Sequence, residues 1–159
     1  MGRGRAQGTE GMGTRGFSAT EMVVAIVGVT VLSAAAVPVL RAQLARVALN
    51  GAARQVATDL MRVRMRAVAE NARYRLAFAG GHYQVEKDVG GDFEAVGAEI
   101  DVPDGVALAV DPDPVVVFRR SGWVDTDAPV AIALTNGLGD GKTVTISFGG
   151  RVAIVEDPT

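Results

Sequence analysis

The first residues that could direct chemistry lie where a basic segment meets an uncharged one. Gly16 and Phe17 mark this junction, and Glu21 directly precedes residues 22–40, which carry no charge. A carboxylate in a membrane helix costs on the order of 3 kcal/mol at mid-bilayer and less near the interface. Such a carboxylate usually has a partner, so Glu21 is a candidate for an ion pair. The alternative is a carboxylate that only favours the positive end of the helix dipole.

Other reactive residue types form no recognisable catalytic or metal site. The chain has no cysteine and one histidine, His82, which argues against thiolate sites and histidine-based catalysis. The acidic residues 111, 113, 125 and 127 form two isolated pairs, whereas Ca²⁺ needs several converging oxygens, so exposed turns are favoured. Residues 136–143 end like a P-loop, but Asn136 replaces its first glycine and a strand follows. We therefore expect no enzyme, metal or cofactor.

The N-terminal region predicts a membrane segment. Residues 1–16 are rich in glycine and arginine and favour a disordered leader. Residues 22–40, as a helix rising about 1.5 Å per residue, nearly span a bilayer core of about 30 Å. The positive leader should remain in the cytoplasm. An alternative is an ordinary signal-peptidase site within residues 33–36, which would release a secreted domain.

The next segment, from Arg41 to about Arg73, predicts an amphipathic helix. Its apolar residues follow a 4-3-4-3-4 spacing and form one stripe, made of Leu49, Ala53, Val56, Leu60, Val63 and Ala67. Pro38 is the only turn signal between the uncharged and amphipathic runs. The sequence therefore predicts one long helix over about residues 17–73, with Gly51 as a weak point.

After Tyr74 the pattern predicts strands throughout. Gly80-Gly81 and Gly149-Gly150 are links of hairpin length. The expected strands are Tyr74–Ala79, Tyr83–Lys87, Phe93–Val96, Val106–Val110, Val115–Arg119, Val130–Thr135, Thr143–Phe148 and Arg151–Val155. The fold class is therefore α+β, with a long N-terminal helix packed on a C-terminal antiparallel β domain.

The formal net charge of −2 hides a strong asymmetry along the chain. Residues 41–75 hold eight arginines against two acids, a net of +6, and residues 76–159 hold five basic residues against 14 acidic ones, a net of −9. Such asymmetry often reflects binding partners rather than fold. The alternative is an arginine-rich helix face that is simply solvated.

The junction resembles the class III signal of type IV prepilins and type II secretion pseudopilins. The similarity rests on Gly16, Phe17, Glu21, the uncharged run and Pro38. It implies that a membrane aspartyl peptidase cuts after Gly16 and methylates Phe17. It also implies that the Phe17 amine of one subunit pairs with Glu21 of another, and that Pro38 belongs to the helix used in assembly.

Three later segments are similar to the minor-pilin group that contains the H-type pseudopilins and FimT-like pilins. They are residues 60–71, 118–123 and 144–152. The first departs from the group's pattern at Val63 and at Glu70, where the group often has alanine and arginine. This resemblance implies a structural subunit of a type II secretion filament, or of a related type IV pilus.

A DNA-binding minor pilin is the alternative function. Some FimT-like relatives in DNA-uptake pili bind DNA through a basic patch near the C-terminus, around a Gly-Arg-x-Arg pattern. The candidate contacts here are Arg119, Arg120 and Arg151. The second arginine of the pattern is absent, and Glu156 and Asp157 follow. DNA affinity requires several phosphate contacts, so these acidic surroundings argue against it.

The expected organisation has four parts. Residues 1–16 are a cleaved leader, 17–40 the transmembrane and assembly half of the helix, 41–75 its amphipathic half, and 76–159 a periplasmic β domain. The expected partners are other pilin or pseudopilin subunits, prepilin peptidase, the inner membrane and, as a candidate, secreted cargo. The protein would cross the inner membrane once, with its N-terminus in the cytoplasm, and then enter a periplasmic filament.

Overall fold

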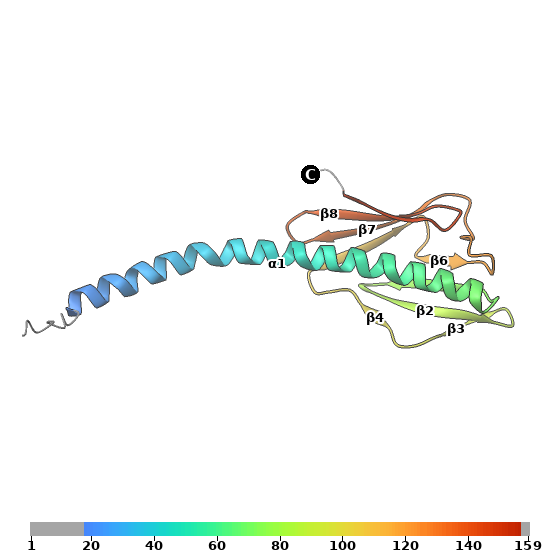
Figure 1. The fold of residues 1–159 in the computed structure, drawn as a ribbon, viewed down its shortest axis with the longest axis horizontal. Coiled ribbons are helices and arrows are strands. Elements are labelled where there is room, and N and C mark those ends of the chain that lie inside the picture. The colour runs from blue at the N-terminus through green and yellow to red at the C-terminus, as the bar shows by residue number, and fades with distance from the viewer. Residues whose placement is uncertain (1–17, 157–159) are drawn as a thin grey trace, which may run out of the picture. The chain divides into compact units, whose positions relative to one another are not determined.

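A computed structural model describes residues 18–156, apart from the side chains of residues 31, 32, 34 and 35. The chain divides into two units, residues 1–39 and 40–159, and each is described by itself. Helix α1 (Ala19–Ala69) begins in the first unit and continues into the second (Figure 1). The predicted single helix is confirmed, and Pro38 lies inside it. The predicted leader and Phe17 lie outside the described residues.

The described part of the first unit is the beginning of α1. The Ser18 amide donates to Glu21 Oε2 at 3.1 Å, and the Thr20 amide donates to Ser18 Oγ at 3.2 Å. These two bonds satisfy amide groups that have no partner in the first helical turn, as in a capping box. Within the residues that the structure describes, we find no helix with the length and apolarity needed to cross a membrane.

The second unit contains the end of α1 and the β domain. The helix ends because Asn71 adopts a positive φ of 48°, and the Ala72 amide then bonds to the Ala67 carbonyl at 3.2 Å. The helix thus ends a few residues before the predicted position, and the chain turns directly into the first strand.

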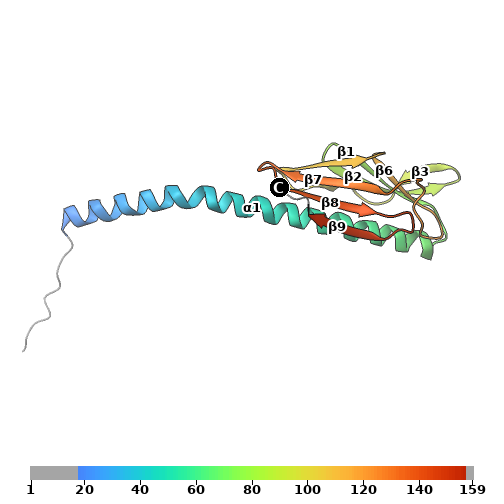
Figure 2. The same ribbon diagram turned by 90° about the horizontal axis from the view of Figure 1, so that it is seen from above.

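Two antiparallel sheets make up the β domain of the described chain. The first contains β1 (Tyr74–Ala79), β2 (His82–Val89), β3 (Asp92–Ala95), β4 (Ile100–Asp101) and β6 (Val115–Phe118), in the order β3-β2-β1-β6, with β4 also paired to β2. The second contains β5 (Val106–Asp111), β7 (Val130–Asn136), β8 (Gly141–Ile146) and β9 (Val152–Glu156), in the order β5-β7-β8-β9. Figure 2 shows β9 at the edge beside the second half of α1.

All eight expected strands are present: β1 has the predicted bounds, and the other seven differ at one or both ends. The short β4 was missed. The Gly80-Gly81 hairpin is confirmed because Ala79 pairs with His82. Gly149-Gly150 lie within a longer connection, since the β8–β9 ladder closes at Ile146 and Val152. Residues 137–140 connect β7 to β8, so the segment that resembles a P-loop is a hairpin loop.

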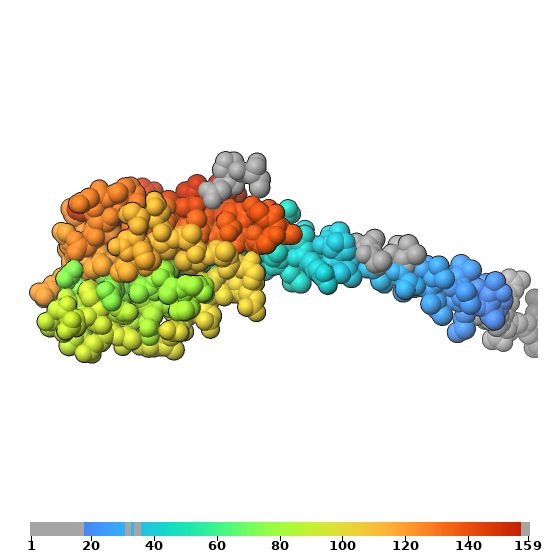
Figure 3. Space-filling model, turned by 180° about the vertical axis from the view of Figure 1, so that it is seen from behind, coloured from blue at the N-terminus to red at the C-terminus, as the bar shows by residue number. Residues whose placement is uncertain are grey.

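The core lies between α1 and the two sheets. The predicted stripe is confirmed, since Leu49, Ala53, Val56, Leu60, Val63 and Ala67 are all buried. Buried strand residues alternate along the chain, as expected for strands with one face on the core. They include Tyr74, Leu76, Val116, Phe118, Ile132, Leu134, Val144 and Ile146. Figure 3 views the molecule from behind and shows residues of both sheets on the side of the second unit that faces away from the second half of α1.

One buried polar cluster joins α1 to β2. The Tyr83 hydroxyl donates to Asp59 Oδ2 at 2.7 Å, and Arg62 Nη1 donates to Asp59 Oδ1 at 2.7 Å. Burial, and then the hydrogen bond to the Asp59 carboxylate, raise the pKa of Tyr83 well above its ordinary value. The Asp59 carboxylate therefore enters the core with a donor at each oxygen, which offsets its desolvation.

Candidate assembly surface

The second unit presents an exposed surface at the C-terminal end of α1, centred on Arg64. Arg64 Nε donates to the Gly122 carbonyl at 3.0 Å. Gly150 lies against the same two groups, because a Cβ placed on it would lie 2.7 Å from Arg64 Nε and 2.5 Å from Gly122 O. Both glycines have positive φ, 79° at Gly122 and 76° at Gly150, which glycine adopts without strain.

Backbone hydrogen bonds hold the two loops that meet at Arg64. The Gly122 amide donates to the Arg119 carbonyl at 2.8 Å, and the Gly150 amide donates to the Ser147 carbonyl at 2.8 Å. The Val124 amide joins the loops by donating to the Phe148 carbonyl at 3.0 Å. The three segments that resemble the minor-pilin group thus meet at one point. The spacing of these segments along the chain does not indicate that Arg64, Gly122 and Gly150 are in contact.

The loops place two aromatic side chains at the surface. Trp123 and Phe148 pack edge to face with ring centroids 4.8 Å apart, and they remain 49% and 45% exposed. On α1, Met61, Met65 and Val68 are also exposed, and with Arg64 and Ala69 they line a shallow apolar depression of about 440 Å³. We call Met61, Met65, Val68, Trp123 and Phe148 the helix-end patch.

The helix-end patch was not predicted from the sequence, although part of its signal was available. One stripe on α1 was predicted, and that stripe is buried. A second series, at residues 54, 58, 61, 65 and 68, has the same 4-3 spacing and is exposed. The contribution of Trp123 and Phe148 could not be predicted, because it depends on where two distant loops lie.

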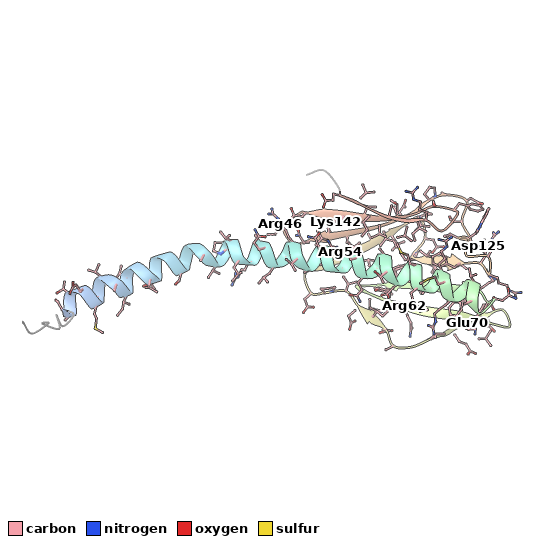
Figure 4. The ribbon with its side chains drawn as sticks, in the orientation of Figure 1. Arg46, Arg54, Arg62, Glu70, Asp125 and Lys142 are labelled. Carbon is pink, nitrogen blue, oxygen red and sulfur yellow. The ribbon has the colours of Figure 1, made fainter. Side chains whose placement is uncertain are left out.

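Ion pairs within the second unit neutralise much of the basic segment, so the charge asymmetry along the sequence is partly balanced in the folded chain. Arg46 contacts Asp140 at 3.2 Å, Arg73 contacts Asp125 at 3.2 Å, and Arg75 pairs with Glu86. Figure 4 shows Arg46, Arg54, Arg62 and Glu70 spaced along the second half of α1. Some of the arginines in residues 41–75 thus pair with carboxylates of the β domain itself.

Glu70 anchors the end of α1 to the first hairpin. Its carboxylate accepts hydrogen bonds from Lys87 Nζ, at 2.7 Å, and from the Tyr74 hydroxyl. These two bonds, that of Lys87 first, lower the pKa of the Glu70 carboxyl. An arginine at this position, as in the pattern that the sequence resembles, could not accept these bonds.

The three candidate DNA contacts do not form one free basic cluster. Arg119 is paired with Asp125, and its hydrogen bonds are the main cause of the lowered pKa of that carboxyl. Arg119 and Arg120 line a depression with Arg73, Ser121 and Asp125, and Arg151 is not part of that lining. Among residues 18–156, Arg120 and Arg151 have no carboxylate within salt-bridge distance.

The remaining predicted site residues belong to the first unit or lie outside the description. Gly16 and Phe17 lie outside the described residues. Glu21 belongs to the capping bonds with Ser18, and Pro38 lies within α1. Among the side chains that the structure describes, no group of three or more His, Cys, Asp or Glu residues could hold a metal ion.

A helix with one stripe buried on two antiparallel sheets defines the class of pilin-like subunits. The family described as "Type II transport protein GspH" matches residues 52–150, and the chain belongs to this family. It is thus a minor pseudopilin, a structural subunit of a type II secretion or type IV pilus-like filament. Members of the family are anchored in the inner membrane, extend into the periplasm and assemble with other pilin subunits.

Solved structures of pilin-like proteins share the fold. The minor pseudopilin EpsH from the Type 2 Secretion System of Vibrio cholerae aligns with a TM-score of 0.58 and 11% identity, over 68% of this chain and 96% of that one. The type IV minor pilin FimU of Pseudomonas aeruginosa aligns with a TM-score of 0.59 and 18% identity, over 71% of this chain and 90% of that one. The comparison with curated proteins found no match.

Proposed function

We propose that this minor pseudopilin works in a type II secretion filament, made as a precursor that is cut after Gly16. The observation that carries the proposal is the family match over residues 52–150. The basic leader, the Gly16-Phe17 junction and the uncharged run that follows also support it. The β domain would face the periplasm, where it would contact other subunits and secreted cargo.

In this proposal α1 has two roles. Its first half would enter the inner membrane and then the filament, where Phe17, Glu21 and Pro38 would serve assembly. Its second half packs on the β domain through the buried stripe. The role is structural and uses no catalytic group, metal or cofactor.

A role in DNA uptake is less well supported by the charges of the second unit. Arg119 is already paired with Asp125, which leaves Arg120 and Arg151 as the exposed candidates without a described carboxylate. Two phosphate contacts give weak, salt-sensitive affinity. Deleting the gene should therefore reduce protein secretion and leave transformation frequency unchanged, and the opposite result would favour the DNA-uptake alternative.

The proposed processing is tested at the mature N-terminus. In cells with a prepilin peptidase, mass spectrometry should find a chain that begins at Phe17. Removing three arginines and one glutamate changes the formal net charge from −2 to −4. Gly16→Ala should slow or block the cut, whereas Gly13→Ala, a matched change within the leader, should not. A mature chain that begins near Ala36 or Val37 would contradict the proposal.

A further inference from the structure

Strand β6 leaves one of its edges open. It lies at one end of the first sheet, and β1 is the strand that pairs with it among those described (Figure 1). The Phe78 amide donates to the Pro114 carbonyl at 2.8 Å on the β1 side, and the Asp125 amide donates to the Val117 carbonyl at 2.8 Å on the other side. Backbone groups alternate between the two sides of an antiparallel strand, so the Val115 amide and carbonyl and the Val117 amide face away from β1. In the described chain, no hydrogen bond reaches these three groups on that side.

A groove of about 570 Å³ lies beside this open edge. Its wall is apolar and includes Val115, Val117, Val124 and Val130. Val116 is 0% exposed, so its neighbours Val115 and Val117 face the other side of the sheet, away from the core and from α1. Unpaired backbone groups beside apolar side chains are the surface that an extended segment uses when it adds a strand to a sheet.

Two prolines restrict the open edge to a short stretch. Pro112 and Pro114 precede the free groups of β6, and neither has an amide hydrogen to donate to a further strand. At the other end, the Val117 carbonyl is already bonded to the Asp125 amide. The open edge therefore matches a few residues of a partner rather than a whole strand, which keeps it from acting as a general site of aggregation.

The rim of the groove specifies the charge of the partner. Asp113 and Asp127 line the groove, and both are exposed. Among the described residues, neither carboxylate has a cation within salt-bridge distance. The other charged groups in the lining, Asp125 and Arg75, are held by ion pairs of their own. Lys or Arg side chains of a bound segment would pair with the two free carboxylates, whereas acidic side chains would be repelled.

We propose that this groove, which we call the β6 groove, binds an extended segment of a secreted protein as a short strand added to β6. The segment alternates apolar residues, which contact the valines, with Lys or Arg, which pair with Asp113 and Asp127. In the proposed function α1 enters the filament, so a groove on the opposite face of the sheet remains open to proteins of the periplasm. The inference rests on the proposed function, because it takes its partner from the proteins that the system secretes.

A fluorescein-labelled peptide of alternating lysine and valine is the probe. It is titrated with the full-length protein in detergent, and fluorescence anisotropy reports binding. The probe should bind at least about tenfold more tightly than a peptide of alternating glutamate and valine, which has the opposite charge. It should also bind better than a peptide of alternating lysine and proline, which keeps the charge but cannot add a strand. Equal binding of either control peptide, or no binding of the probe, would overturn the proposal.

Variants of the protein test the rim and the edge separately. Asp113→Asn with Asp127→Asn should weaken binding of the probe roughly three- to tenfold, because two exposed ion pairs are lost. Asp92→Asn with Asp104→Asn is the matched control, since it removes two exposed carboxylates outside the groove lining and should leave binding unchanged. Val117→Pro removes an open amide where an edge strand tolerates proline, and it should also weaken binding.

Circular dichroism checks that each variant is folded. If Val117→Pro is not, the asparagine variants and the lysine-proline peptide decide the question, because they leave the strand unchanged. An equal loss of binding in the matched control, or no loss in the Asp113 and Asp127 variant, would overturn the proposal.

The source of the bound segment is identified in secreting cells. The chain has no cysteine, so Ala128→Cys, in the groove lining, carries a single benzophenone label. Ala98→Cys, also exposed but outside the lining, is the control. Position 128, and not position 98, should cross-link to a secreted protein. Mass spectrometry of the cross-linked peptide should find apolar residues alternating with Lys or Arg.

The other outcomes of the cross-linking separate this inference from the proposed function. Cross-links from position 128 to a pilin-like subunit, to a second copy of this chain or to nucleic acid would overturn the inference. If deleting the gene reduces secretion but position 128 gives no cross-link to a secreted protein, the assignment of the β6 groove is wrong and the proposed function stands. If the deletion leaves secretion unchanged, the proposed function fails first.

Discussion

Arg64 and the two glycines beside it show how single residues fix the surface of this subunit. The guanidinium of Arg64 reaches the Gly122 carbonyl only because Gly150 has no side chain between them. The positive φ of Gly150 adds a second requirement, since other residues are strained in this conformation. Glycine is therefore needed at this position for both space and backbone conformation.

Gly150→Ala should lower the free energy of unfolding by roughly 1–3 kcal/mol, because alanine meets both penalties. Gly149→Ala is a matched control, since an added Cβ there has no neighbour within 4 Å and Gly149 has no positive φ. Urea unfolding of the two variants measures the difference. Equal stability would mean that the loop moves away from Arg64 without cost.

Glu21 has a local partner as well as a proposed one in a neighbouring subunit. Glu21→Gln retains an oxygen that can accept from the Ser18 amide, and it removes the charge. The variant should insert and be cut normally but enter the filament poorly. In the proposed assembly it leaves the Phe17 amine of a neighbouring subunit buried without a partner, which costs roughly 3–5 kcal/mol. Ser18→Ala removes the bond to the Thr20 amide and keeps the charge, so it should assemble.

Cross-linking to partner subunits at equal membrane levels compares the two substitutions. Assembly that fails for Ser18→Ala and survives for Glu21→Gln would make helix capping, and not the ion pair, the function of these residues.

Tyr83 predicts a pH dependence of stability. Its pKa is raised in the folded chain, so this contribution is complete below the unfolded value of about 10 and is lost as the pH rises towards the folded value. The thermal stability of the wild type, measured by its unfolding temperature, should therefore fall steeply above about pH 10. Tyr83→Phe should reduce this steepness and, because Asp59 loses a donor, cost about 1–3 kcal/mol at neutral pH. An unchanged pH profile would contradict this account.

At the scale of elements, the second half of α1 has two stripes with the same period and opposite environments. Leu60, in the buried stripe, is 0% exposed, and Met61, in the exposed series, is 46% exposed. The two residues are adjacent in sequence, so their substitution by the same residue separates burial from helix propensity.

Leu60→Asp should unfold the second unit, because an unpaired carboxylate in the core costs several kcal/mol. Met61→Asp should retain the fold within about 0.5 kcal/mol, because its carboxylate stays in water. Circular dichroism and thermal unfolding measure both. Similar effects of the two substitutions would contradict the assignment of the buried stripe.

At the scale of the whole molecule, the second unit has what an independently folding domain needs. It contains the buried stripe of α1, both sheets and the ion pairs of Arg46, Arg73 and Arg75. A chain that begins at Arg41 should therefore be soluble and should show helix together with substantial strand by circular dichroism. An insoluble or all-helical product would contradict the two-part organisation. A version that begins at Gly51 removes Arg46 and Leu49 and should be less stable.

The sequence by itself determined the order of elements, since a period of 3.6 residues and a period of two residues are local properties. The stripe from Leu49 to Ala67, the Gly80-Gly81 hairpin and the α+β class all follow from such patterns. The helix end differed because the positive φ of Asn71 closes α1 near Ala69. The short β4 was missed because two residues carry no periodic signal.

Only the tertiary structure decided which residues meet across the chain. Arg64, Gly122 and Gly150 lie far apart in sequence, and their contact depends on how two loops pack against α1. The same packing brings Trp123 and Phe148 together and pairs Arg119 with Asp125. Local patterns specify which face of an element is apolar. The neighbour of each face depends on long-range packing, and this decided that one stripe of α1 is buried and the other is exposed.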